Sequence, residues 1–372
     1  MALPLILFLL VVFIYSLVIF LFSTGIRKCA LSYTQGKDLP GKVSIIIPFH
    51  REMENLAHLV QDLLDQSYPR SFYEVLLVDD HSEKGFSEKV KTMLSGISGF
   101  QCLSIPQGSS GKKAAINFGI QTAKYDRLIQ VDADCRVGKH FISSHMAFLE
   151  EDPADLVAGL VLSSKGNGGF IEAYERLDLM ALAGSGAGSF ALGRPMMCSG
   201  ANLSYSRELY EETRRFDPVE LSESGDDMFL MIGARKLNKK LAFNTGAGAR
   251  VSTLPVKSFR QLLAQRIRWG AKTYHYGMAD IQGLALLVSL TNLAIFLLPL
   301  WCILFTEYWP WLAGGWLFKS LSDLVLLVRI SGISHQRDVL PWFLPVSLVY
   351  YPFFFISLIG ALLGRSGWKK DH

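Results

Sequence analysis

The sequence predicts an α/β protein in which a mostly parallel, Rossmann-like sheet is combined with one N-terminal and about three C-terminal transmembrane helices. Three observations predict this fold class. In the middle of the chain, short β-branched runs alternate with polar, helix-prone stretches, as in a doubly wound sheet. Long apolar segments stand before and after this region. Acidic side chains follow two predicted strands, at the sheet edge where ligands bind.

Residues 1–25 are predicted to be a transmembrane anchor. Residues 3–22 form an uncharged apolar run of about 20 residues, the length that crosses a bilayer core. Arg27 and Lys28 follow this run, whereas a cleaved signal peptide carries its basic residues in front. Because positive flanks stay inside, we expect the N-terminus outside and the chain from Arg27 onward in the cytosol.

Residues 40–255 are predicted to form one catalytic domain, because 372 residues of which half are hydrophobic suffice for one globular core plus several spans. The β-branched runs predict strands at 43–48, 74–79, 100–105 and 127–131, and residues 196–199 are also strand-like. The stretches between the first runs predict helices at about 54–66, 86–94, 111–123 and 138–150.

The end of the chain is predicted to return to the membrane. Residues 256–280 indicate an interfacial helix, and 283–365 a transmembrane region with spans at 283–305, 309–330 and 339–363. Four complete crossings leave the basic C-terminus, with Arg365, Lys369 and Lys370, outside, against the positive-inside rule. One C-terminal segment is therefore expected to cross incompletely. The candidates are 309–330, which carries Lys319 and Asp323, and 339–363, which Pro345 and Pro352 interrupt.

Composition excludes several other classes of protein. A net charge of +4, with no basic and aromatic side chains interleaved, is not that of a nucleic-acid binder. The five cysteines are far apart without a C-x-x-C pair, so the sequence suggests neither a disulfide framework nor a zinc site. A reducing compartment fits this pattern.

Two acidic groups follow predicted strands of the same sheet. Asp79 and Asp80 end one strand, and Asp132-Ala133-Asp134 follows another. Carboxylates spaced in this way can bind a hydroxyl-rich ligand and a hard divalent cation that clamps phosphate oxygens. A solvated turn or a helix cap explains an isolated Asp-x-Asp better, but two such groups at one sheet edge favour a site.

Between these strands, a glycine-containing loop opens a helix with Lys112. The loop is not a Walker A motif, which requires Gly where Pro106 stands and Ser or Thr where Lys113 stands. Basic residues at a helix N-terminus suit an anionic diphosphate, and solvated surface lysines explain them equally well.

Two later groups carry further chemistry. Asp226 and Asp227 open an apolar helical stretch, where they either cap the helix or, for Asp227, deprotonate an acceptor hydroxyl. Gln265-Arg266-Ile267-Arg268-Trp269 is either an interfacial basic helix or a group that holds the acceptor and a departing diphosphate.

Six motifs in this order resemble the signature of the family 2 glycosyltransferases. They are Ile47-Pro48-Phe49-His50-Arg51-Glu52, Val78-Asp79-Asp80, Gly111-Lys112-Lys113, Asp132-Ala133-Asp134, Gly225-Asp226-Asp227 and Gln265-Arg266-Ile267-Arg268-Trp269. The chain is similar to the membrane-bound branch that includes cellulose, chitin, hyaluronan and poly-N-acetylglucosamine synthases and ceramide glucosyltransferase. It departs from the pattern at Arg51, where Asn is common, and at Asp226, where Glu is frequent.

The resemblance implies a GT-A fold, an inverting mechanism, a UDP-sugar or similar donor, and Mg or Mn as cofactor. Donor-binding residues are expected to be Pro48, Glu52, Asp80, Lys112 and Asp132. Asp132 and Asp134 are expected to bind the metal, and Asp227 to be the catalytic base. Residues at the acceptor and diphosphate are expected to be Gly200, Asn202, Gln265, Arg268 and Trp269.

The expected function is transfer of a sugar to a lipid, lipid-linked or glycan acceptor at the cytosolic face of a membrane, and we expect an integral protein of the bacterial inner membrane. A processive polysaccharide synthase is the alternative enzyme, although the chain has fewer spans than polymer-extruding synthases usually have. A non-catalytic membrane scaffold with a retained glycosyltransferase fold is the alternative from another class, but a scaffold has no need for carboxylates clustered at one sheet edge.

Overall fold

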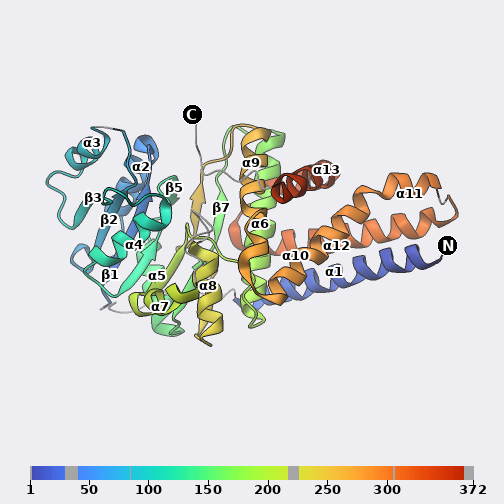
Figure 1. The fold of residues 1–372 in the computed structure, drawn as a ribbon, viewed down its shortest axis with the longest axis horizontal. Helices are drawn as coiled ribbons and strands as arrows, with labels where there is room; N and C mark the ends of the chain where they lie inside the picture. Colours follow the sequence, from blue (N-terminus) through green and yellow to red (C-terminus); the bar gives the residue numbers. More distant parts are fainter. Residues whose placement is uncertain (1, 30–40, 84, 217–225, 305, 364–372) are drawn as a thin grey trace. The chain divides into compact units, whose positions relative to one another are not determined.

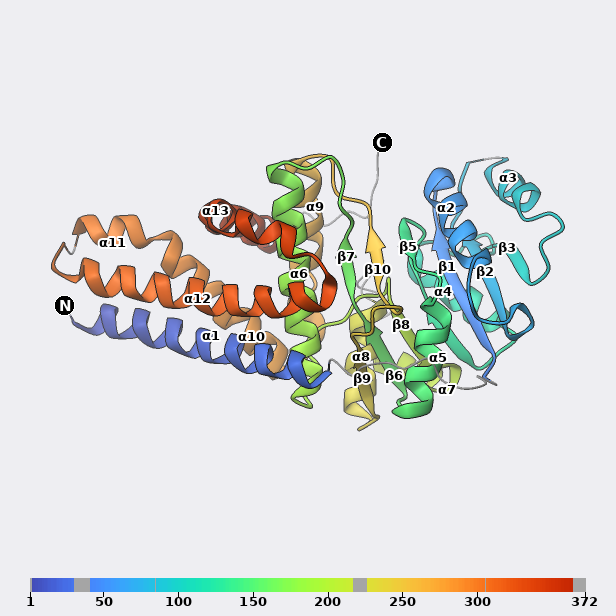
Figure 2. The same cartoon turned by 180° about the vertical axis from the view of Figure 1, so that it is seen from behind.

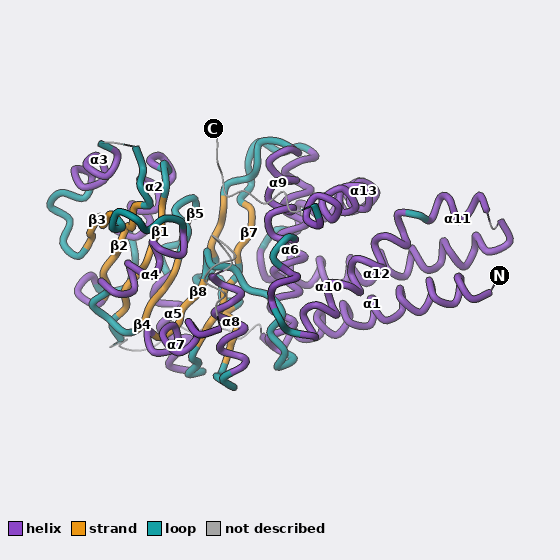
Figure 3. The backbone as a smooth tube through the Cα atoms, viewed as in Figure 1, coloured by secondary structure: helices purple, strands orange, loops and turns teal. Residues whose placement is uncertain are grey.

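The computed structural model describes residues 2–29, 41–83, 85–216, 226–304 and 306–363. Gly225 and the basic residues Arg365, Lys369 and Lys370, which the sequence analysis used, lie outside these ranges. The chain divides into two compact units. The helical unit comprises residues 1–28, 165–196 and 255–372, and the sheet unit comprises residues 29–164 and 197–254. Figure 3 distinguishes helices and strands by colour, and every strand in the described ranges belongs to the sheet unit.

The sheet unit is built on a seven-stranded sheet (Figure 1). In spatial order its strands are β3 (Phe100–Ser104), β2 (Tyr73–Asp79), β1 (Val43–Phe49), β4 (Arg127–Gln130), β8 (Leu203–Ser206), β6 (Leu156–Gly159) and β9 (Leu241–Asn244). The first four are parallel, β8 is antiparallel to both of its neighbours, and β6 is parallel to β9. Because β1 and β2 are buried along their whole length, they read as continuous apolar runs rather than as alternating ones.

A second, three-stranded sheet has the order β5 (Cys135–Val137), β10 (Val251–Thr253), β7 (Val161–Ser163). β10 pairs antiparallel with β5 and parallel with β7. Since β5 begins at Cys135, directly after the Asp132-Ala133-Asp134 turn, this small sheet holds the C-terminal side of that turn in place.

Helices connect the strands of the large sheet along the chain and cover the sheet. They are α2 (Met53–Leu64), α3 (Phe86–Met93), α4 (Lys112–Thr122), α5 (Phe141–Glu151), α7 (Arg207–Thr213) and α8 (Asp226–Lys236). In α2 the buried residues Leu56, Leu59, Val60 and Leu63 recur at helical spacing and pack into the core cluster that includes β1. A side chain at Gly119 of α4 would meet Ile46 of β1 at 2.8 Å, so glycine allows this helix to approach the sheet.

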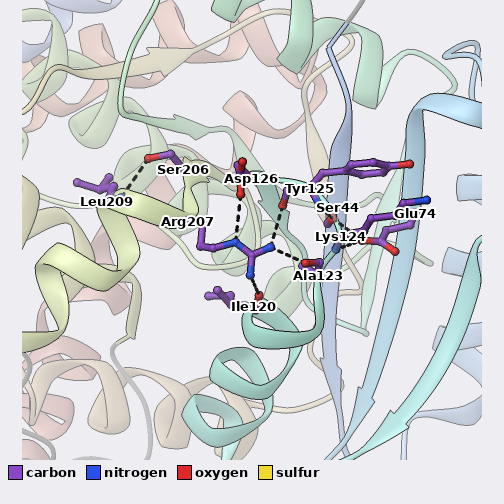
Figure 4. Close-up of polar contacts among 10 residues, drawn as sticks. All are labelled: Ser44, Glu74, Ile120, Ala123, Lys124, Tyr125, Asp126, Ser206, Arg207 and Leu209. Carbon is purple, nitrogen blue, oxygen red and sulfur yellow. Dashed lines mark hydrogen bonds and ion pairs between the residues drawn. The ribbon is translucent and has the colours of Figure 1, made fainter.

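At the start of β1 and β4, Arg207 joins three segments of the sheet unit (Figure 4). Its guanidinium donates to the carbonyl oxygens of Ile120, Ala123 and Tyr125 and contacts Asp126. Nearby, Ser44 donates to Glu74 at 2.6 Å and accepts from the Tyr125 amide at 3.1 Å. These bonds satisfy buried polar groups at the end of the strands opposite to the predicted site.

The helical unit contains α1 (Ala2–Cys29), α6 (Phe170–Ala191), α9 (Phe259–Gly270), α10 (Ala279–Phe296), α11 (Leu298–Leu304), α12 (Trp309–Ser334) and α13 (Phe343–Leu362) (Figure 2). Among the described residues, four segments are long and apolar enough to span a membrane: Leu3–Ile26, Ala279–Phe296, Thr306–Ser334 and Arg337–Leu362. Many large apolar side chains on them are exposed, which indicates a lipid-facing surface and membrane association.

Helices α1 and α12 run side by side in the same direction (Figure 2). Phe8, near the start of α1, lies against Gly315, near the start of α12. Near the opposite ends, a Cβ atom added to Gly184 of α6 would lie 3.4 Å from both Ile26 of α1 and Ile330 of α12. The C-terminal ends of α1 and α12 therefore lie at the same level.

The fold class is confirmed, with four predicted strands, four predicted helices and four candidate spans at about the expected positions. Residues 196–199, expected to be strand-like, are not a strand; the strand begins at Leu203. Residues 165–196, which we placed within a continuous 40–255 domain, belong to the helical unit because α6 packs against α12 and α13. Apolar composition alone does not distinguish these two environments.

Neither segment named as the incomplete span is interrupted as a helix. Lys319 and Asp323 form an ion pair of 2.8 Å within the continuous helix α12, and Tyr15 donates to Asp323 at 2.9 Å. Helix α13 continues through Pro352. The break instead separates α10 from α11 at Leu297, two residues before Pro299, whose ring and missing N–H disfavour a continuous helix.

Candidate active site

The carboxyl ends of β2 and β4 bring the predicted acidic groups to one edge of the sheet. Asp79 ends β2, and its carboxylate accepts from Ser82 and Ser87, so it holds the following turn. Asp80 is 8% exposed and accepts the backbone N–H of Gly111 at 3.0 Å with both oxygens. Gly111 has a φ of +92°, a conformation that favours glycine. Asp80 thus positions the loop that begins α4.

Lys112, the first residue of α4, faces a cluster of carboxylates. Its Nζ atom lies 2.5 Å from Oδ1 of Asp132, which follows β4. Burial opposes the positive charge, but Asp132, Asp226 and Asp227 outweigh this effect and raise the pKa of Lys112. The ammonium therefore stays charged. Burial and the neighbouring carboxylates in turn raise the pKa of Asp132, although Lys112 partly offsets them.

Asp227 lies near the start of α8 and accepts two backbone amides. The N–H of Gly200 donates to Oδ2 at 2.9 Å, and the N–H of Met228 donates to Oδ1 at 2.8 Å. Each carboxylate oxygen keeps a further lone pair. Burial and the neighbouring Asp226 raise the pKa of Asp227, while Lys112 and the two amides lower it. Asp227 is thus an oriented carboxylate with capacity to accept a proton.

Asp226 and Gly200 surround this carboxylate. Gln130, the last residue of β4, donates from Nε2 to Asp226 at 2.8 Å and accepts from the hydroxyl of Tyr205 at 2.8 Å. A Cβ atom at Gly200 would lie 2.9 Å from Gln130 and 3.4 Å from Asp226, so only glycine fits without a shift. Sequence reasoning did not single out Gln130, because an isolated glutamine at a strand end carries no recognisable pattern.

Asp132 and Asp134 fit a divalent cation only as part of its ligand set. Both carboxylates belong to the turn after β4, and Asp134 is exposed. In the part of the chain that the structure describes, no group of three or more His, Cys, Asp or Glu side chains forms a complete metal site. Mg²⁺ is commonly held by one or two carboxylates together with substrate phosphates, so the residues fit an ion shared with a diphosphate.

The residues expected to bind the nucleoside lie around the end of β1. Pro48 is buried in β1. The pairing of β1 with β4 ends at Ile46, before Pro48, so the missing N–H of proline removes no hydrogen bond to β4. His50 contacts the carbonyl of Asp80 at 2.7 Å through Nδ1. Glu52 precedes α2 and accepts from Asn55 at 2.9 Å. Pro48, Glu52 and Asp80 thus come from two adjacent strand ends.

Asn202 has a structural place rather than the one expected beside an acceptor. Its side chain is fully buried and donates to the carbonyls of Leu160 and Ala249 at 2.9 and 2.8 Å. Its Oδ1 atom contacts Nε2 of His145 at 3.0 Å. The amide is engaged within the protein and has no exposed atom for an acceptor, which the motif alone did not reveal.

The last predicted group belongs to α9 in the helical unit. Oε1 of Gln265 is buried and has no hydrogen-bond partner among the described residues. Arg266 forms a buried ion pair with Asp178 of α6, and its guanidinium lies 4.4 Å from the ring centroid of Trp269. Arg266 is therefore not the solvated charge of an ordinary interfacial helix, and Asp178 was not foreseen. Arg268 is half-buried on the same helix.

Comparison with known proteins agrees with the family that the motifs resemble. Residues 44–214 match the sequence model of glycosyl transferase family 2. The glycosyltransferase AglE of Haloferax volcanii is 28% identical over 262 residues, which cover 70% of this chain and 80% of AglE. An N-acetylglucosaminyltransferase of Rhizobium meliloti is 24% identical over 81% of this chain and 67% of its own length. A poly(ribitol-phosphate) beta-glucosyltransferase of Bacillus spizizenii is 23% identical, over 53% of this chain and only 30% of that protein.

Among solved structures, the mannosyltransferase PcManGT of Pyrobaculum calidifontis is similar, with a TM-score of 0.59 and 16% sequence identity. The match covers 99% of both chains, and that protein was solved in complex with GDP-Man and Mn2+. At this level of identity the likeness concerns the fold, which is GT-A. The motifs, the sheet and the sequence matches agree, and residues 44–214 form a family 2 glycosyltransferase domain.

Proposed function

We propose that the protein catalyses an inverting transfer of a sugar from a nucleotide diphosphate donor to a lipid, lipid-linked or glycan acceptor at the cytosolic face of a membrane. The observation that carries the proposal is the orientation of Asp227 by two backbone amides, beside Lys112 and Asp132. A carboxylate held in this way, close to a fixed positive charge, suits a general base next to an anionic leaving group.

In this mechanism Asp227 accepts the proton of the acceptor hydroxyl as its oxygen attacks the anomeric carbon. The bond from that carbon to the diphosphate breaks, the nucleotide diphosphate leaves with the electron pair, and the configuration inverts. Lys112 remains protonated and stabilises the charge that develops on the leaving oxygen. When bound at Asp132 and Asp134, Mg or Mn would supply further electrophilic stabilisation of the diphosphate.

The donor is proposed to be a sugar nucleotide, with UDP as the expected nucleotide. The GDP-Man of PcManGT makes a GDP-sugar the other choice to test. We propose Pro48, Glu52 and Asp80 for the nucleoside, and Gln265, Arg268 and Trp269 for the acceptor end and diphosphate. Gly200 contributes by placing its N–H on Asp227 rather than by a side chain.

Release of nucleotide diphosphate by the purified full-length protein tests the proposal. A panel of UDP-glucose, UDP-N-acetylglucosamine and GDP-mannose would be assayed with Mg or Mn and with a membrane lipid extract as acceptor source. We expect metal-dependent turnover with one donor and a loss of about 100-fold or more in Asp227→Asn. Asp65→Asn, an exposed carboxylate on the same unit, is the matched control and should retain full activity.

Product length separates the two enzymatic readings. A single added sugar supports transfer to a lipid or glycan, whereas a ladder of chains would show a processive synthase. No turnover with any donor, from a protein with a normal unfolding transition, would instead favour the scaffold.

A further inference from the structure

A pocket of about 810 Å³ lies in the helical unit, formed by residues before and within α6 and by the connection from α12 to α13. Its wall includes the cationic side chains of Lys165, Arg176 and Arg337 and the carboxylate of Asp338. None of these residues belongs to the carboxylate site at the sheet edge, so the pocket requires an explanation of its own.

One wall of the pocket is fixed by a bidentate ion pair. Arg176, with a side chain only 6% exposed, donates to the two carboxylate oxygens of Asp338 at 3.0 and 2.8 Å. Glu172, one turn earlier on α6, lies 3.8 Å from the same guanidinium. The charge of Arg176 is thus compensated from two sides, and its role is to fasten the α12–α13 connection to α6.

The two other cations are available to a ligand. Among the described residues, the guanidinium of Arg337 has neither a hydrogen-bond nor an ion-pair partner, and Arg337 is exposed. The side chain of Lys165 is 71% exposed, and its ammonium lies 3.6 Å from the carboxylate of Asp338, its partner in an ion pair. The carboxylates of Glu172 and Asp338 both contact Arg176. Against these two negative charges stand the three cations of the pocket wall, so positive charge remains in excess.

The position of the pocket along α12 places it at a boundary between polar and apolar surface. It includes Ser331 and Ser334 at the C-terminal end of α12, at the level where α1 ends. Val328, one turn earlier, is 46% exposed, and Leu344, just after the connection, is 57% exposed. An apolar surface next to exposed cations is typical of the membrane interface.

We propose that this pocket binds a phosphate group through Arg337 and Lys165, with the Arg176–Asp338 pair as its rigid wall. Guanidinium and ammonium groups together are suited to phosphate oxygens, the guanidinium through paired N–H donors and the ammonium as a point charge. The phosphate belongs to a phospholipid headgroup or to a soluble phosphate compound. This inference does not depend on the proposed transferase mechanism.

Ligand-induced stabilisation of the full-length protein tests the proposal. The protein would be delipidated in a neutral detergent and titrated with phosphatidylglycerol, phosphatidylcholine or inorganic phosphate while its thermal unfolding midpoint is recorded. We expect phosphatidylglycerol or inorganic phosphate to raise the midpoint saturably. In Lys165→Gln/Arg337→Gln the half-saturating concentration should rise about tenfold or more.

Two further variants make the result specific. Lys257→Gln/Arg260→Gln removes the same residue types from exposed positions of the same unit and should bind as the wild type does. Arg337→Lys keeps the charge and should retain most of the binding.

Saturation by phosphatidylglycerol but not by inorganic phosphate assigns the pocket to a lipid headgroup, and saturation by inorganic phosphate assigns it to a soluble compound. The proposal is overturned if neither ligand gives a saturable shift, or if the Lys165/Arg337 and Lys257/Arg260 variants weaken binding equally.

Discussion

At the scale of single residues, the site depends on how neighbouring charges shift one another's pKa values. Asp227 has a like charge, Asp226, on one side and the cation Lys112 on another. Asp226 raises the pKa of Asp227, whereas Lys112 lowers it. The catalytic behaviour of Asp227 is therefore expected to respond to substitutions that never touch the substrate.

Asp226→Asn should move the acid limb of the pH–activity profile to lower pH. A general base acts only when ionised, so activity falls as the pH drops through its pKa, and loss of the neighbouring charge lowers that pKa. Asparagine retains an oxygen that can accept from Gln130.

The measurement is nucleotide diphosphate release between pH 4 and 8, with Asp65→Asn as control. A shift to higher pH would contradict the assigned role of Asp227.

His145 predicts a second pH effect, on stability rather than on activity. Burial lowers the pKa of His145 to about 4, although its bond to Asn202 partly opposes this. Because the unfolded state takes up a proton near pH 6.5 and the folded state does not, stability is complete above that pH and decreases as the pH falls towards 4.

At pH 5 the free energy of unfolding should be about 2 kcal/mol lower than at pH 7.5 through His145 alone. Thermal unfolding of the wild type and of His145→Gln at both pH values measures this difference. Glutamine does not titrate and can still donate to Asn202, so its midpoint should decrease less on acidification. Equal decreases in the two proteins would show that other groups cause the acid sensitivity.

At the scale of elements, α6 organises the helical unit through one ion pair and one close approach. Asp178 of α6 binds Arg266 of α9, and their side chains are only 10% and 12% exposed. Gly188 of α6, which no sequence pattern singled out, lies against α1. A Cβ atom there would be 2.3 Å from the Phe22 carbonyl oxygen.

Asp178→Asn should destabilise the protein by about 3 kcal/mol, because it leaves the guanidinium of Arg266 buried without its carboxylate. The midpoint of thermal unfolding in detergent measures the effect. Replacement of both partners by apolar residues, Asp178→Leu with Arg266→Met, should recover most of the loss, since no buried charge remains. If the double variant is as unstable as the single one, packing rather than charge explains the cost.

Gly188→Ala should lower the unfolding midpoint, at a cost of about 1–3 kcal/mol, because backbone atoms of α1 occupy the space of the new methyl group. Gly184→Ala is the matched control on the same helix. Its Cβ atom would meet only side chains at 3.4 Å or more, which is ordinary contact, so it should be neutral or slightly stabilising through helix propensity. Similar midpoints for both variants would refute the close packing of α1 and α6.

At the scale of the whole molecule, the order of the spans predicts which side of the membrane each connection faces. If α1 leads into the cytosol, the connection between α11 and α12 lies outside, and the one between α12 and α13 lies in the cytosol. The parallel course of α1 and α12 agrees with this assignment.

Cysteines introduced one at a time at Glu307 and Lys165, in a Cys302→Ser background, test this topology in cells. A membrane-impermeant maleimide should label Glu307→Cys on intact cells and Lys165→Cys only after permeabilisation, because the two positions are expected on opposite faces of the membrane. The Cys302→Ser parent gives the background from the remaining cysteines. Labelling of Lys165→Cys on intact cells would reverse the proposed orientation.

The sequence by itself determined the strand and helix pattern, the four apolar segments and the acidic groups at the sheet edge. These follow from local periodicity and from the rule that parallel strands end at one edge. Asp132 stands just after the end of a strand, and Lys112 and Asp227 stand at the start of helices, which are positions that local patterns predict.

Only the tertiary structure decided which of these residues meet and which serve the fold. It assigned α6 to the helical unit, turned Asn202 inward, joined Arg266 to Asp178, and showed Gln130 beside Asp226. Each of these contacts joins residues far apart in the chain. Periodicity and local propensity carry no information about such partners, because burial and pairing depend on how the elements pack.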